Sequence, residues 1–244
     1  TEFDARTGTL SVTFEFDVTD PDLLDDGNRL AEGIRVVIYA GDGTHDIKFP
    51  EGEPIGNAQI DVGLSGQVYK YPLDTYTGFF AIAVETYERQ AGGINETTGT
   101  VRAGLDVDSS ISGWEIEATL AQEGGYPTAL IDLRRAFSTK VFAVVLVAMA
   151  ISVVILAFIA AVLTVTNRRR FEVALLTWNG ALLFALPLLR NYLPGSPPIG
   201  AAMDMYIYLW VFVFAVTSLT LMVIAWSQQR KADLVEERAK LESQ

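Results

Sequence analysis

"VFAVVLVAMAISVVILAFIAAVLTVT" occupies residues 141–166 and decides the architecture, because none of its 26 residues carries a charge. A helix needs about 20 apolar residues to cross the hydrocarbon core of a bilayer. Two further apolar runs follow: "VALLTWNGALLFALPLL" at 173–189, near the lower length limit, and the aromatic-rich "MYIYLWVFVFAVTSLTLMVIAW" at 205–226. The sequence therefore predicts a multi-pass membrane protein with three α-helical transmembrane spans.

The charged residues divide the chain into two parts. Residues 1–130 hold 7 Lys and Arg against 23 Asp and Glu, a net charge of −16, whereas residues 131–244 hold 11 against 7, a net charge of +4. There is no cysteine, which excludes disulfides and thiolate metal sites, and there is one histidine, His45. The negative charge of the acidic part argues against nucleic acid as a partner, because the phosphate backbone is also negatively charged.

The acidic part has the alternating pattern of β-strands. In "TLSVTFEFDV" at 9–18, Leu, Val and Phe alternate with polar residues, which places the apolar side chains on one face. Similar runs lie at 34–40, 58–62, 67–71, 78–87, 100–107, 114–120 and 129–137. About eight short strands separated by turn residues predict an all-β antiparallel sandwich. We expect this sandwich over residues 1–137, a transmembrane region over 138–229 with spans at about 141–166, 173–189 and 201–226, and a tail over 230–244.

Basic residues predict the orientation in the cell membrane. Arg168, Arg169 and Arg170 follow the first span and four basic residues follow the third, against four on the opposite side. Because Lys and Arg favour the cytoplasmic side, the C-terminus is expected to be cytoplasmic and the β domain extracytoplasmic. Export of that domain leads us to expect a signal peptide or a further span before Thr1. The "NET" sequon at Asn95 is a glycosylation acceptor only where the host modifies exported proteins.

The loop "LRNYLPGSPPIGAAMD" at 189–204 connects the last two runs and contains three prolines. Ser196 is expected to cap a helix that begins at Pro197, since proline is tolerated at the first helical position. The loop is then either a tight connection only or a docking surface for the β domain or for a partner. Inside the membrane, Asn179 and Gly180 are expected at a helix–helix contact, because an amide in hydrocarbon needs a partner.

The sequence contains only weak candidates for a metal-binding or catalytic site. An acidic loop could bind calcium through carboxylate oxygens, although its spacing is not that of an EF-hand loop. The candidate ligands are Asp17, Asp20, Asp22, Asp25 and Asp26. His45 is expected to be a surface-loop residue. No catalytic residue and no cofactor other than calcium are predicted.

Two stretches resemble an uncharacterised family of bacterial and fungal membrane proteins, known only as a domain of unknown function. They are "YPLDTYTGFF" at 71–80 and the proline-rich loop with the span that follows it. The family's pattern corresponds to Arg190, Asn191, Pro194, Gly195, Pro197, Pro198, Gly200, Asp204 and Trp210. The resemblance implies an N-terminal span, an extracytoplasmic β domain and three C-terminal spans, and it supplies no activity.

A looser resemblance is to pentameric ligand-gated channels, which have a similar Pro-Asp turn and a similar basic pair before their first span. Tyr71-Pro72-Leu73-Asp74 and Arg134-Arg135 carry it, but the run at 173–189 lacks the polar pattern of a pore helix. We hypothesise that Asp74 or its neighbours pack against the loop at 190–204. Residues expected to couple the domain to the membrane or to contact a partner are Tyr71, Pro72, Asp74, Tyr76, Arg190, Asn191, Pro194, Pro197, Pro198 and Asp204.

The sequence is most consistent with a non-enzymatic membrane protein, an accessory, scaffolding or interaction subunit of a larger envelope or energy-transducing complex. Its expected partners are the lipid bilayer and other membrane protein subunits. Three alternatives stay open: an oligomeric receptor similar to a ligand-gated channel, a calcium-dependent sensing or adhesion module, and an enzyme with a carboxylate site in the sandwich.

Overall fold

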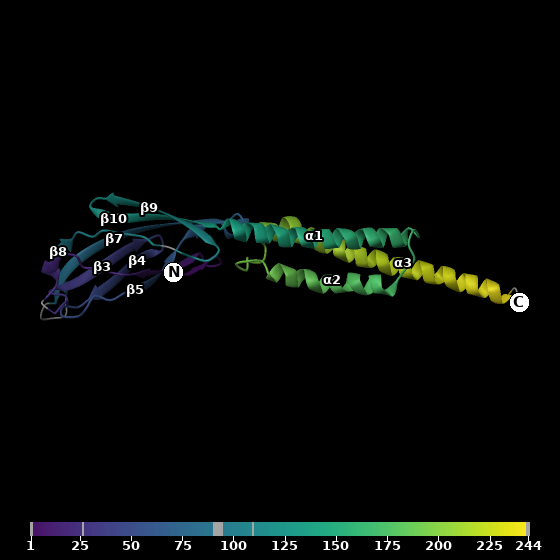
Figure 1. Ribbon diagram of the computed structural model, residues 1–244, viewed down its shortest axis with the longest axis horizontal. Helices are drawn as coiled ribbons and strands as arrows, with labels where there is room; N and C mark the ends of the chain where they lie inside the picture. Colours follow the sequence, from purple (N-terminus) through teal and green to yellow (C-terminus); the bar gives the residue numbers. More distant parts are fainter. Residues whose placement is uncertain (1, 26, 90–94, 109, 243–244) are drawn as a thin grey trace. The chain divides into compact units, whose positions relative to one another are not determined.

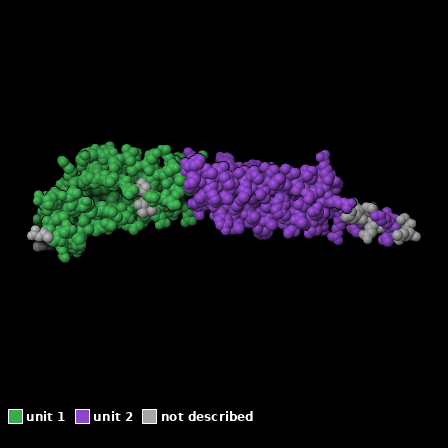
Figure 2. All heavy atoms as spheres, in the orientation of Figure 1, with its two compact units in different colours: residues 1–68, 73–136 green, residues 69–72, 137–244 purple. Residues whose placement is uncertain are grey.

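A computed structural model describes residues 2–25, 27–89, 95–108 and 110–242, which form two compact units (Figure 2). The β unit comprises Thr1–Val68 and Leu73–Ala136, and the helical unit comprises Tyr69–Pro72 and Phe137–Gln244. Four residues between two strands of the β unit therefore belong to the helical unit.

The β unit contains two antiparallel sheets (Figure 1). One has the order β1 (Glu2–Asp4), β2 (Thr9–Phe14), β5 (Ala58–Gly63). The other has the order β4 (Gly43–Phe49), β3 (Gly33–Ala40), β7 (Thr75–Arg89), β10 (Tyr126–Arg135), β9 (Trp114–Glu123), and β6 (Ser65–Gly66) and β8 (Asn95–Val101) also pair with β7. Two short 3-10 helices, η1 (Pro21–Leu23) and η2 (Val68–Lys70), lie between strands.

Apolar side chains from both sheets share one core. Leu10 and Val62 of the smaller sheet cluster with Ile38, Phe80 and Leu133 of the larger one, and all five are buried. Alternation produces this arrangement, because every second residue of a strand points to the same face. The expected antiparallel β region is confirmed.

The long strand β7 has two neighbours on each side. On one side β3 pairs with residues 80–87 and β6 with residues 76–77; on the other side β10 pairs with residues 75–81 and β8 with residues 84–89. The ladder is interrupted at 78–79 on the first side and at 82–83 on the second. Each interruption coincides with a hollow, of about 450 Å³ beside Phe79 and about 470 Å³ beside Ile82.

The helical unit consists of α1 (Phe137–Val165), α2 (Val173–Asn191), a π-helical turn η3 (Asp204–Tyr208) and α3 (Leu209–Glu242). Within the described residues, three helical segments are long and apolar enough to cross a membrane: Phe137–Val165, Val173–Asn191 and Asp204–Lys231. The expected three apolar helices are confirmed.

Several local predictions were wrong. Residues 67–71 do not form a strand: residues 68–70 form η2 and Tyr71 is buried in the helical unit. The expected strand at 100–107 ends at Val101. The strand β4 was not predicted, because both of its faces carry polar residues. No helix begins at Pro197, because Gly195 and Ser196 have positive φ and the carbonyl groups that follow bond to a side chain.

Candidate functional site

Arg190, at the end of α2, closes the proline-rich loop. Its Nε lies 3.1 Å from Oδ1 of Asp204 and its Nη2 lies 2.7 Å from Oδ2, so the pair is bidentate. The same Nη2 donates to the carbonyl oxygens of Pro197 and Pro198, each at 3.0 Å. The amide of Gly200 donates to Oδ2 of Asp204 at 3.0 Å. One guanidinium group thus fixes both ends of the loop, which explains how the chain can turn sharply between α2 and α3.

Tyr71 is packed against this loop within the helical unit. Its side chain is 2% exposed and clusters with Ala143 and Val147 of α1, and with Leu193 and Ala201 of the loop. Because aromatic side chains bury a large area, this residue is a principal apolar contact of the loop. The structure therefore brings together Tyr71 and the loop at 190–204, two segments that the sequence paired only by hypothesis.

Asp74 forms a buried ion pair within the β unit. Oδ1 and Oδ2 accept from Nε and Nη2 of Arg135 at 2.6 and 2.9 Å, and the two side chains are 0% and 2% exposed. The Tyr76 hydroxyl donates to Asp74 Oδ2 at 3.2 Å and to the Ala5 carbonyl oxygen at 3.0 Å. Burial, followed by the adjacent carboxylate, raises the pKa of Tyr76, so it stays a neutral donor.

Trp114 completes this polar site. The Arg135 guanidinium carbon lies 4.5 Å from its ring centroid, a cation–π distance, and the ring packs edge-on against Phe3 and Tyr76. Arg135 ends β10 and α1 begins at Phe137. The ion pair therefore ties the turn before β7 to the last residue of the β unit's final strand.

The outer face of the larger sheet carries an exposed apolar patch that the sequence prediction missed. Tyr39, Phe79 and Leu130 are 49%, 43% and 46% exposed. Phe79 pairs directly with Leu130, and Tyr39 pairs with Ala81, so the three side chains share the face opposite the core. We call these three residues the outer-face patch. The detectable signal was that "VVIYA" and "GFFAIA" are apolar on both faces of their strands.

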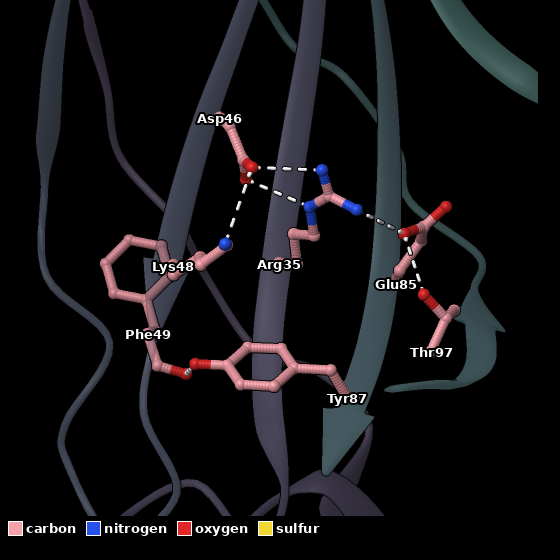
Figure 3. A network of polar contacts seen from close by, with 7 residues as sticks. All are labelled: Arg35, Asp46, Lys48, Phe49, Glu85, Tyr87 and Thr97. Carbon is pink, nitrogen blue, oxygen red and sulfur yellow. Dashed lines mark hydrogen bonds and ion pairs between the residues drawn. The ribbon is translucent and has the colours of Figure 1, made fainter. Parts of the chain in front are cut away.

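A network of charged side chains lies further along β3 and β7 on the same face (Figure 3). Arg35 of β3 makes a bidentate pair with Asp46 of β4, at 3.0 and 2.9 Å, and its Nη1 lies 3.6 Å from Glu85 of β7. Lys48 Nζ lies 3.7 Å from Asp46 and Thr97 donates to Glu85 at 3.4 Å. The hydrogen bond from Arg35 holds the pKa of Asp46 below its usual value. This network links β4, β3, β7 and β8.

Asn179 and Ser218 form the polar contact between α2 and α3. The Ser218 hydroxyl donates to Asn179 Oδ1 at 2.5 Å, and Asn179 Nδ2 donates to the Leu175 carbonyl oxygen at 2.9 Å. Both side chains are buried. At Gly180, by contrast, a Cβ atom would meet no described heavy atom within 4 Å, so no close helix contact requires glycine there.

The acidic loop uses two of its carboxylates for local turns. Asp20 accepts from the amide of Asp22 at 3.1 Å, and Asp25 accepts from the amides of Gly27 and Arg29. Asp26 lies outside the described residues. His45 lies on β4, with Nε2 3.5 Å from Asp42. In the part of the chain that the structure describes, no group of three or more His, Asp or Glu side chains is placed to hold a metal ion.

Comparison with protein families divides the chain at nearly the same place as the structure. Residues 1–134 match the family described as Domain of unknown function (DUF4436), and residues 135–229 match the one described as Domain of unknown function (DUF8686). No curated protein matches the chain. The expectation of an uncharacterised family is therefore confirmed. Because the first match covers more than half of the sequence, the chain belongs to the DUF4436 family, and a DUF8686 region follows.

Proposed function

We propose that this chain is a non-enzymatic integral membrane protein that acts as an accessory or interaction subunit of a larger membrane complex. In this proposal the three apolar helices span the bilayer, the β unit is an extracytoplasmic sandwich and the C-terminus is cytoplasmic. The apolar helices, the core shared by both sheets and the basic residues after α1 and α3 support it. So does the resemblance to bacterial and fungal membrane proteins.

The outer-face patch is the observation that carries the interaction role. Three large apolar side chains stand exposed around smaller residues of β3 and β7, and the hollow at 78–79 adjoins Phe79 and Leu130. Exposed apolar patches next to polar residues mark protein contact sites, and aromatic residues are enriched at their centres. Since residues 1–130 carry a net charge of −16, the partner surface that fits best has an apolar anchor surrounded by basic residues.

Site-specific photo-crosslinking in native membranes tests the role of the patch. A photoreactive phenylalanine analogue replaces Phe79 in one variant and Leu120 in a matched control, since Leu120 is also exposed in the β unit at 46%. We expect a defined adduct with another protein from position 79 and not from position 120. The adduct should disappear when Leu130→Ser is added. Equal adducts at both positions, or none at 79 while the protein is correctly inserted, would contradict the proposed role.

A second candidate function, a gated homo-oligomer, is favoured by one specific arrangement. Arg135, which pairs with Asp74, precedes α1 by two residues in the sequence, and Tyr71, three residues before Asp74 in the sequence, packs with the α2–α3 loop in the helical unit. The mass of the protein in a mild detergent separates the two functions. A symmetric homo-oligomer without other proteins favours gating, whereas a stable hetero-complex favours the accessory subunit.

A further inference from the structure

The loop between α1 and α2 is held against α3 by one glutamine. Gln229 Nε2 lies 3.2 Å from the carbonyl oxygens of Thr164 and Arg169, to which it donates, and 3.5 Å from Asn167 Oδ1. Its Oε1 accepts from the amide of Phe171 at 2.7 Å. The loop is thus fixed by bonds to both of its ends. The C-terminal end of α1, the N-terminal end of α2 and residue 229 of α3 therefore lie together.

Positive charge gathers at this end. We define the basic cluster as five exposed side chains, Arg168, Arg169, Arg170, Arg230 and Lys231. From 166 to 231 the sequence has two acids, Glu172 and Asp204. Glu172 lies 3.5 Å from Arg169, and Asp204 pairs with Arg190 at the opposite ends of α2 and α3. Among residues 166–231, one acid, Glu172, therefore faces the five basic side chains of the cluster.

The cluster lies where the apolar segments end. The three candidate spans end at Val165, begin at Val173 and end at Lys231 on this side. Trp226, one turn before Arg230, is 40% exposed, and the Arg230 guanidinium carbon lies 5.5 Å from its ring centroid. Exposed tryptophans favour the headgroup level of a bilayer, and juxtamembrane basic residues attract anionic lipid.

We propose that the basic cluster binds the phosphate headgroups of anionic phospholipids in the leaflet at this end of the helical unit. Gln229 acts as the positioning residue, because its bonds to the loop hold the three loop arginines beside Arg230 and Lys231. Guanidinium groups suit this ligand, since each presents a planar pair of donors to phosphate oxygens. The inference rests on the proposed membrane insertion and adds a lipid class to it.

Lipid titration into the full chain in a mild detergent tests the site, with phosphatidylglycerol and phosphatidylcholine as probes. The test variant is R168Q/R169Q/R170Q. The matched control is R6Q/R102Q/R134Q, which removes the same charge from three exposed arginines of the β unit. Each loop arginine contributes about fivefold to anionic-lipid affinity at low salt. We expect the phosphatidylglycerol dissociation constant to rise on the order of 100-fold in the test variant and to change less than about twofold in the control.

The other possible results distinguish a wrong lipid site from wrong membrane insertion and from binding of soluble phosphate. If the wild type binds both lipids equally, or if the test variant keeps its preference, the headgroup site is wrong while membrane insertion stands. If neither lipid binds, the headgroup site is likewise wrong, and membrane insertion is decided separately by whether the chain stays in native membranes during alkaline carbonate extraction. If excess inorganic phosphate displaces phosphatidylglycerol completely, the cluster takes soluble phosphate, which overturns the lipid assignment.

Discussion

Asp74→Asn should destabilise the β unit far more than an equivalent change on its surface. The substitution removes the carboxylate charge but leaves the Arg135 guanidinium buried, at 2% side-chain exposure. Breaking a buried pair from one side typically costs about 3–5 kcal/mol, because the remaining charge is uncompensated. An amide oxygen can still accept one of the two bonds, so we expect about 3 kcal/mol. Tyr76 keeps the Ala5 carbonyl oxygen as an acceptor and adds little to the loss.

Asp46→Asn is the matched control. Asp46 makes the same bidentate contact with Arg35, but the two side chains are 34% and 36% exposed. Solvent screens such a pair, and exposed pairs contribute about 0.2–1 kcal/mol. The two variants remove the same group from the same kind of contact and differ mainly in burial.

Urea unfolding of the full chain in detergent measures both losses. Trp114 reports on the site directly, because its ring stacks on Arg135. The other three tryptophans belong to the helical unit and are replaced by phenylalanine in the background; they are Trp178, Trp210 and Trp226. Equal losses in the Asp74 and Asp46 variants would refute the reasoning from burial. D74L/R135M should recover most of the stability, since an apolar pair leaves no buried charge.

Three further predictions concern the other contacts. Tyr71→Ala should lower the free energy of unfolding of the helical unit by about 3–5 kcal/mol. Tyr69→Ala, at a site that is 54% exposed, should lower it by less than about 0.5 kcal/mol. Thermal unfolding followed by helical circular dichroism measures both losses, and similar losses would show that the burial of Tyr71 is unimportant. Asn179→Ala should lower the free energy of unfolding in detergent by about 0.6 kcal/mol and at most about 1.7 kcal/mol. Adding Ser218→Ala should lower it little further, because the two side chains share one hydrogen bond. Fully additive losses would argue against that bond. The folded-state pKa of Asp46 is lowered, so its contribution is complete above the unfolded pKa of about 3.9 and is lost as pH falls through the lower folded value. The stability difference between wild type and Asp46→Asn should therefore be constant near neutral pH and vanish in strong acid; a difference that grows on acidification contradicts this sign.

Periodicity and composition predicted the elements that local pattern controls. An uncharged run of 26 residues has few alternatives to a long apolar helix, and the alternation in β2, β3 and β7 followed from burial of one face. The edge strand β4 could not be recognised, since polar residues lie on both of its faces. The run at 67–71 has the same alternation as a strand, but Tyr71 is buried by the helical unit, and that contact is distant in sequence.

The candidate sites were less predictable because their partners lie far apart along the chain. Asp74 and Arg135 are 61 positions apart, and each had been singled out within its own motif without being paired with the other. Arg190 and Asp204 lie in one quoted stretch, yet nothing in that stretch indicates that a single guanidinium group also binds two prolyl carbonyl groups. The outer-face patch required the strand register, because only pairing shows that Tyr39, Phe79 and Leu130 lie on one face.

The hydrogen bond between Asn179 and Ser218 has a consequence for synthesis of the chain. Its partners are separated by 39 residues. At about 5–20 residues per second, the ribosome adds Ser218 about 2–8 s after it adds Asn179. During that interval Nδ2 can already donate to the Leu175 carbonyl oxygen within α2, and only Oδ1 waits for α3. In the membrane arrangement that we propose, α2 therefore enters with one unpaired acceptor, which finds its partner only when α3 arrives.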